Sequence, residues 1–170
     1  MAIKKNLVLL GMMGVGKSTT GKYVAKKLKI NFFDVDRLIE KNNNMKIAQI
    51  FEQKGEKYFR KNEEFFSLKY LDKKKSVISL GGGAFINNKI RNKVLSNCVS
   101  IWLNLSLENL YKRLKNNKKR PMINKNDPEN IKKLFEERKK IYCLANYEIN
   151  CDNLTINELS EKIIKLYENV

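Results

Sequence analysis

A cluster of glycines directly after an apolar segment constrains this chain more than any other feature. Leu7–Leu10 has the character of a buried strand, and the residues that follow it read GMMGVGKST. A structural turn needs at most one glycine with a positive φ angle. Here three glycines precede Lys17 and Ser18, at the spacing G-x-x-x-x-G-K-[ST], whose backbone N–H groups surround phosphates. The pattern predicts a nucleotide-phosphate site between a strand and a helix.

Apolar periodicity predicts that strands and helices alternate along the chain. The expected strands are Leu7–Leu10, Asn31–Val35, Val77–Leu80, Val99–Leu105 and Tyr147–Asn150. The expected helices are Lys17–Leu28, Ile47–Gln53, Tyr58–Leu71, a helix that Asp127 caps and that runs from Pro128 to about Ala145, and a last helix with a capping box of Thr155 and Glu158. This order predicts an α/β fold of three layers, with helices on both faces of a five-stranded parallel sheet.

The chain contains no internal repeat and no linker, so we expect residues 1–170 to form one domain. Residues 116–127 form its most polar stretch, either an ordinary surface loop or a mobile lid over an active site. No apolar run approaches the length that spans a bilayer, and no membrane partner is expected. Three unpaired cysteines, Cys98, Cys143 and Cys151, indicate reduced thiols and a cytoplasmic protein.

The net charge of +17 raises the question of a nucleic-acid partner. Lysines are scattered along the whole chain and accompany asparagine runs, which indicates a compositional bias with solvated helix faces. No nucleic-acid-binding motif accompanies the charge, so we expect no nucleic-acid partner. The complete absence of histidine excludes histidine-based triads and histidine-ligated metals.

Polar and glycine residues follow the expected strands at the edge where ligands bind in such folds. Lys17 is expected to bridge the transferred phosphates, and Ser18 to ligate Mg²⁺. Asp34 and Asp36 are two residues apart, so in an extended chain they point to the same side. An N-cap could use Asp36 alone, which would leave Asp34 unexplained; one carboxylate near Mg²⁺ and one for an alcohol acceptor account for the pair.

The third expected strand ends in Gly81, Gly82 and Gly83, which predicts a close approach of backbone to a small ligand. Only six of the 35 basic residues are arginine, and an arginine binds carboxylate or phosphate with a planar fork that lysine lacks. Arg60, Arg138 and Arg120 therefore predict an anionic acceptor and a clamp for the transition state.

The tetrapeptide Asn124–Asp127 matches the guanine-specifying N-K-x-D of GTPases. No apolar strand precedes it, Pro128 follows it, and the chain has no D-x-x-G switch. We therefore reject a GTPase.

Taken in order, the segments GMMGVGKST, FFDVD, IAQIFEQKGEKYFRKNEE, SLGGGA, RP and ERKKIY resemble those of shikimate kinases. The resemblance covers nearly the whole chain. It implies the fold of the nucleoside monophosphate kinases with a mobile lid, and phosphorylation of the 3-hydroxyl of shikimate by ATP with Mg²⁺, on the route to chorismate and the aromatic amino acids. It also implies a small enzyme that we expect to act as a monomer.

The resemblance also assigns residues. It implies that Asp36, Arg60, Gly82 and Arg138 bind shikimate, with Glu63 supporting Arg60 and with Gly81 and Gly83 beside Gly82. Lys17 and Arg120 match the residues on the transferred phosphate, Ser18 the Mg²⁺ ligand, Asp34 an acid that acts on the metal through water, and Arg113 a residue that packs on adenine. The full set expected to contact ATP is Gly11, Met12, Met13, Gly14, Val15, Gly16, Lys17, Ser18, Thr19, Arg113 and Arg120.

Two segments depart from the family pattern: the lid reads RPMI where leucine is frequent, and the loop NCDNLT lacks a proline that some members place against adenine. Three alternatives stay open. A gluconate kinase would share the phosphate loop without requiring Arg60 and Arg138, a nucleoside monophosphate kinase would discriminate a base, and a basic nucleic-acid-binding protein would show steeply salt-dependent affinity.

Overall fold

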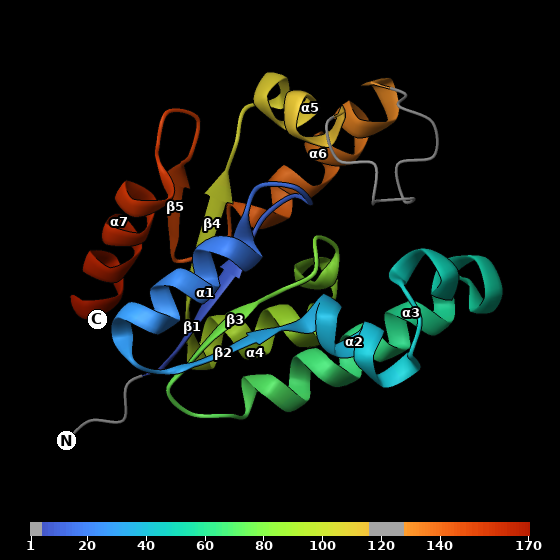
Figure 1. Ribbon diagram of the computed structural model, residues 1–170, viewed down its shortest axis with the longest axis horizontal. Coiled ribbons are helices and arrows are strands. Elements are labelled where there is room, and N and C mark those ends of the chain that lie inside the picture. The colour runs from blue at the N-terminus through green and yellow to red at the C-terminus, as the bar shows by residue number, and fades with distance from the viewer. Residues whose placement is uncertain (1–4, 116–127) are drawn as a thin grey trace.

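A computed structural model of the chain describes residues 5–115 and 128–170, and Figure 1 shows how their elements are arranged. Five strands form one sheet in the order β2-β3-β1-β4-β5, and every neighbouring pair is parallel. The strands are β1 (Asn6–Leu10), β2 (Asn31–Asp34), β3 (Ser76–Ser79), β4 (Cys98–Asn104) and β5 (Tyr147–Asn150). The expected five-stranded parallel sheet is confirmed.

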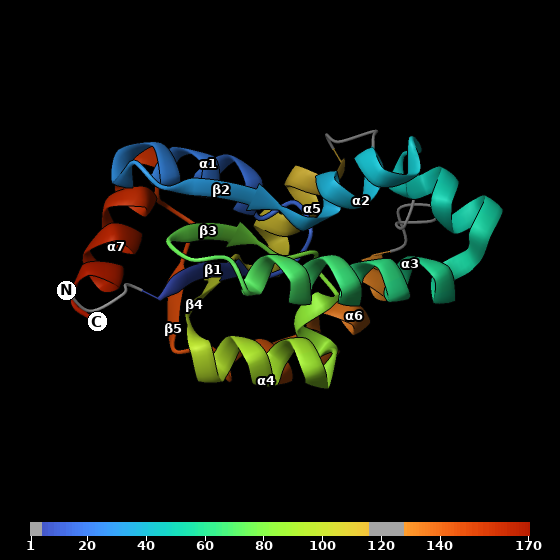
Figure 2. The same ribbon diagram turned by 90° about the horizontal axis from the view of Figure 1, so that it is seen from below.

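Helices cover both faces of this sheet. They are α1 (Lys17–Leu28), α2 (Val35–Asn43), α3 (Ile47–Leu71), α4 (Asn88–Asn97), α5 (Leu107–Lys115), α6 (Pro128–Tyr142) and α7 (Ile156–Glu168), with a short 3₁₀ helix η1 (Ala84–Ile86). Helices α1 and α7 pack together on one face, and α4 lies on the other (Figure 2). No helix in residues 5–115 or 128–170 is long and apolar enough to cross a membrane.

The central strand β1 is buried along its whole length, because helices enclose the sheet on both sides. Leu7, Val8 and Leu9 are fully buried, as is Ile78 on the neighbouring strand. Burying one such side chain contributes about 1.5–3 kcal/mol. This core fixes the carboxyl ends of the strands, so the loops that follow β1, β2 and β3 meet at one edge of the sheet.

Several element bounds differ from those expected. Strands β1, β3 and β4 each begin one residue earlier, and β3 and β4 also end one residue earlier. Strand β2 ends at Asp34 and not at Val35, because the Asp34 carboxylate accepts a hydrogen bond from the Arg37 N–H and caps α2. The two helices expected on either side of residue 55 form one element, α3, with a kink at Gly55, where φ is 78°. Helix α6 ends at Tyr142, three residues before the expected end.

The capping box expected at the last helix is present. The Thr155 hydroxyl accepts from the Glu158 N–H at 3.3 Å, and the Glu158 carboxylate accepts from the Thr155 N–H at 2.8 Å. Helix α6 begins at Pro128, as expected from its sequence, whereas its predicted cap Asp127 lies outside the described residues.

Candidate active site

The loop between β1 and α1 has the backbone that its glycines predict. Gly11, Gly14 and Gly16 adopt φ angles of 138°, 84° and 102°, which side-chain-bearing residues rarely adopt. Helix α1 begins directly after Gly16, so its first N–H groups lack intrahelical partners and are available to an anion. The loop therefore has the conformation that cradles phosphate.

Lys17 lies against this loop. Its ammonium group donates to the carbonyl oxygens of Gly11 at 2.8 Å and of Met12 at 2.9 Å. The residue is only 8% exposed. A buried ammonium held by backbone carbonyls is a positive charge placed in advance at the loop, and it needs only to exchange carbonyl for phosphate oxygens.

A pocket of about 460 Å³ opens beside the phosphate loop. Its lining includes Ser18, Asp34, Asp36, Arg60, Gly82 and Arg138. These residues come from the first turn of α1, from the β2–α2 junction, from α3, from the loop after β3 and from α6. The structure thus brings together residues that are up to 120 positions apart in the sequence, in one cavity next to the phosphate site.

The two aspartates after β2 reach this pocket in a way that differs from the expectation. Asp34 is the last residue of the strand, but Asp36 lies in the first turn of α2, so the expectation of an extended chain through both is wrong. The N-cap is Asp34 and not Asp36, and Asp34 also forms an ion pair with Arg37 at 3.8 Å. Both carboxylates nevertheless line the same pocket.

Arg60 is fixed by two carboxylates of its own helix. Its Nη1 lies 2.6 Å from Glu63 Oε2, and its Nε and Nη2 each lie 3.1 Å from Glu56 Oε1. Glu63 is 3% exposed, and this burial raises the pKa of its carboxyl although the charge of Arg60 opposes the rise. Glu63 thus holds the guanidinium at the pocket wall, as the sequence predicted for an acid beside Arg60.

Arg138 projects from α6 and is 6% exposed. Its Nη1 has no hydrogen-bond partner among the described residues. A buried guanidinium nitrogen without a partner costs free energy, and a carboxylate ligand would satisfy it. Arg138 and Arg60 therefore give the pocket two cationic groups with N–H donors available to a ligand.

The glycines after β3 leave room where these side chains meet. A Cβ on Gly81 would lie 2.6 Å from both Asp36 Oδ1 and Glu63 Oε1, and a Cβ on Gly83 would collide with the Arg60 guanidinium. A Cβ on Gly82 would lie 3.1 Å from Arg138 Nη1. Protein side chains thus approach the backbone closely at these positions, and the expected approach of a small ligand stays a prediction.

A second cavity, of about 230 Å³, lies at the other end of the phosphate loop. Arg113 lines it and donates from Nη1 to the Val15 carbonyl oxygen at 2.9 Å. Cys151 and Leu154, from the loop after β5, form part of the opposite wall. The cavity is mainly apolar and adjoins Gly16, so a flat base attached to phosphates in the loop would fit between Arg113 and this wall.

One predicted site residue, Arg120, lies with the whole predicted lid 116–127 outside the described residues. Sequence reasoning also missed contributors. Phe59 lines the larger pocket, although its helical spacing is equally typical of a core residue. Sequence reasoning also assigned no role to Tyr142 of the segment ERKKIY. Tyr142 follows Arg138 by four residues, which puts both on the same face of the helix, and this spacing is the signal that could have pointed to it.

The sequence matches one family of known proteins over most of its length. A family model described as shikimate kinase matches residues 13–168. A shikimate kinase of Sulfurihydrogenibium sp. (strain YO3AOP1) is 46% identical over 160 residues, which cover 94% of this chain and 96% of the relative.

Solved structures separate the family from the wider fold. A shikimate kinase from Acinetobacter baumannii in complex with shikimate matches with a TM-score of 0.91 at 30% identity, and covers 97% of this chain and 93% of that one. A gluconokinase from Sinorhizobium meliloti 1021 has a TM-score of 0.60 at 13% identity, over 99% and 97% of the two chains, which shows a shared fold alone. The chain belongs to the shikimate kinase family.

Proposed function

We propose that this chain transfers the γ-phosphate of ATP to the 3-hydroxyl of shikimate in the pocket beside its phosphate loop. The products are shikimate 3-phosphate and ADP. The observation that carries the proposal is the buried Nη1 of Arg138, which has no partner among the described residues and belongs to a side chain that lines the same pocket as Arg60. The relative from Acinetobacter baumannii, whose structure holds shikimate, supports the same acceptor.

Shikimate is a carboxylate with three hydroxyl groups, and the pocket offers a partner for each kind of group. Arg60 and Arg138 would hold the carboxylate, since guanidinium groups bind it through paired hydrogen bonds. Glu63 and Glu56 keep Arg60 in place. Asp36 would accept a hydrogen bond from a ring hydroxyl at the side nearest the phosphate loop, and the glycines after β3 allow the ring to approach the backbone.

In the transfer itself, the hydroxyl oxygen attacks the γ-phosphorus as the bond to the β-phosphate oxygen breaks. The Asp36 carboxylate either accepts the hydroxyl proton as a general base or orients the attacking oxygen through a hydrogen bond. Lys17 exchanges its bonds to Gly11 and Met12 for phosphate oxygens and neutralises the charge that develops. Arg120 is proposed to clamp the same phosphate.

The N–H groups of residues 11–16 and of the first turn of α1 would hold the β- and γ-phosphates, and Arg113 would pack on adenine in the smaller cavity. Magnesium fits the donor set here, because the Ser18 hydroxyl and the Asp34 carboxylate line one pocket and both are hard oxygen ligands. Mg²⁺ held there would stabilise the negative charge of the phosphates. We assign Ser18 as a direct ligand and Asp34 as a ligand through water.

We further propose that residues 1–170 act as one domain and as a monomer in the cytoplasm, with residues 116–127 as a lid and without a nucleic-acid partner. Three free cysteines, of which Cys98 and Cys151 are buried, support a reducing compartment. The dispersed lysines support the absence of a nucleic-acid site.

A coupled assay of ADP release tests the proposed acceptor. We expect turnover with ATP and shikimate, and none above background with gluconate or AMP. Turnover with gluconate or AMP in place of shikimate would overturn the proposal.

A further inference from the structure

Tyr142 is the last residue of α6 and one helical turn beyond Arg138. It is 1% exposed and is one of the largest fully buried side chains. Its ring packs against Trp102, with ring centroids 5.9 Å apart. A large aromatic side chain that is fully buried normally belongs to the hydrophobic core, and the ring of Tyr142 does.

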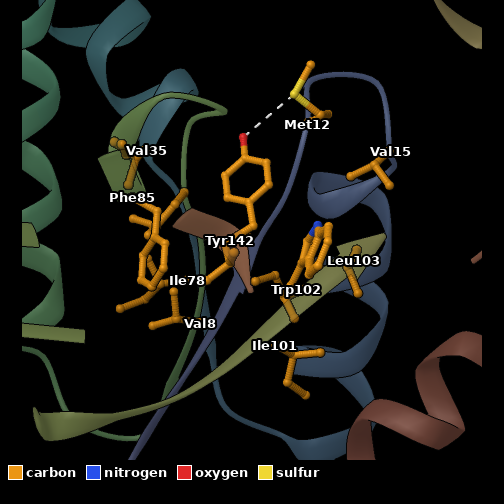
Figure 3. Packing of buried hydrophobic residues seen from close by; sticks show 14 of the residues in the cluster. Val8, Met12, Val15, Val35, Ile78, Phe85, Ile101, Trp102, Leu103 and Tyr142 are labelled. Carbon is orange, nitrogen blue, oxygen red and sulfur yellow. Dashed lines mark hydrogen bonds between the residues drawn. The ribbon is translucent and has the colours of Figure 1, made fainter. Parts of the chain in front are cut away.

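The hydroxyl of Tyr142 points out of the core toward the two loops of the active site. It donates to the carbonyl oxygen of Gly82 and lies 3.8 Å from the sulfur of Met12. Figure 3 shows the hydroxyl directed at Met12, away from the other apolar side chains of the core. Burial raises the pKa of Tyr142 to about 12, so the hydroxyl keeps its proton and remains a donor at any physiological pH.

Gly82 lies where the larger pocket meets the phosphate loop. The position of a Cβ on Gly82 is 3.1 Å from Arg138 Nη1 and 3.3 Å from the Met13 amide nitrogen. A rotation of the Gly82 peptide would therefore disturb its packing against both Arg138 and the phosphate loop. Tyr142 holds the carbonyl of that peptide.

We propose that Tyr142 is a positioning residue, whose hydroxyl sets the Gly82 peptide so that Arg138 and the acceptor lie in register with the phosphate loop. Tyr142 does not line the larger pocket; it acts through Gly82 and through Arg138, whose guanidinium also interacts with its hydroxyl. This inference rests on the proposed function, because it concerns the same acceptor.

The chain offers a matched control in Tyr167 of α7. Its hydroxyl donates to the Lys5 carbonyl oxygen at 2.6 Å, and the residue is 4% exposed. Lys5 precedes β1, at the edge of the sheet opposite the active site. Tyr142→Phe and Tyr167→Phe each remove a hydroxyl that bonds a backbone carbonyl, so a merely structural role predicts similar losses in thermal stability for both.

The experiment measures kcat and KM for shikimate and for ATP in the wild type and both variants, together with their melting temperatures. For Tyr142→Phe we expect kcat/KM for shikimate to fall about tenfold, or about 1.4 kcal/mol, while KM for ATP changes less than about twofold. Tyr167→Phe should keep wild-type constants. The melting temperatures of the two variants should fall by similar amounts.

Wild-type kinetics in Tyr142→Phe, or an equal loss toward both substrates, would overturn the positioning role. The wild-type arm separates this failure from failure of the proposed function. If shikimate is not the acceptor, the wild type itself shows no turnover with it; if only the inference fails, the wild type turns over and the two variants behave alike.

Discussion

Two arginines and one aspartate are proposed to carry the chemistry that distinguishes this site from a general phosphate loop. In a chain whose usual cation is lysine, Arg60 and Arg138 both line the pocket in which we propose that a carboxylate binds. Their surroundings differ: Glu63 and Glu56 hold Arg60 through three of its five N–H groups, whereas Nη1 of Arg138 lacks a partner among the described residues. The first arginine is pre-oriented and the second supplies the unsatisfied donor.

Arg60→Lys should raise KM for shikimate at least about tenfold and leave KM for ATP near its wild-type value. Lysine keeps the charge but lacks the planar guanidinium, whose several N–H groups can bond Glu63, Glu56 and a ligand carboxylate at the same time. Steady-state kinetics with each substrate varied in turn measure the split. Arg91→Lys, on α4, is the control and should change neither constant; unchanged KM for shikimate in Arg60→Lys would place the carboxylate elsewhere.

Asp36→Asn should lower kcat by about 10²-fold or more and leave ATP affinity intact, because an amide cannot accept the hydroxyl proton. Turnover and a nucleotide titration together measure this. Asp72→Asn, at the solvent-exposed end of α3, is the control and should turn over normally. If Asp36→Asn kept more than about a tenth of wild-type kcat, Asp36 would be neither base nor essential orienter.

At the scale of elements, sequence patterns predicted the bounds of α1 and β5 as observed, because the phosphate loop marks the start of one and apolar spacing marks the other. A residue was a less reliable guide to the bounds of an element where it could have two structural roles. Asp34 both ends β2 and caps α2, and Gly55 kinks α3 without ending it. Helices α2, α4 and α5 are not among the helices expected from the sequence. They are only 9 or 10 residues long, and over so few residues an apolar pattern is a weak signal, even in α5, where Leu107, Leu110 and Leu114 recur at helical spacing.

The segment 116–127, between α5 and α6, is the element whose role is predicted from sequence alone. Arg120→Ala should lower kcat by about 10³-fold with a smaller change in shikimate affinity, because a clamp acts mainly on the transition state. Single-turnover kinetics and shikimate titration separate the two effects. Lys119→Ala, next to Arg120, is the control; near-normal kcat in Arg120→Ala would leave the stretch an ordinary loop.

Over the whole molecule, the sequence predicted the sheet, the phosphate loop and most of the pocket, because motifs at the ends of parallel strands converge at one edge. It could not predict contacts that depend on how α6 packs across that edge. The burial of Arg138 and the bond from Tyr142 to Gly82 arise only when α6 lies against the loops after β1 and β3.

Burial in the core also controls how reactive the cysteine thiols are. Burial raises the pKa of Cys98 to about 11 and of Cys151 to about 12, whereas Cys143 is exposed. Because the thiolate is the nucleophile, raised pKa values leave little reactive form below pH 9. Iodoacetamide at pH 8, followed by mass spectrometry, should modify Cys143 first, and all three only after unfolding; rapid native modification of Cys98 would contradict this packing.

The central claim is that shikimate lies with its carboxylate on Arg60 and Arg138 and its reacting hydroxyl at Asp36. A crystal structure of the chain with shikimate and ADP tests this most directly. The account predicts a carboxylate oxygen within hydrogen-bond distance of Arg138 Nη1, and the 3-hydroxyl between Asp36 and the phosphate loop. A carboxylate bound away from both arginines, or a 3-hydroxyl turned away from Asp36, would contradict it.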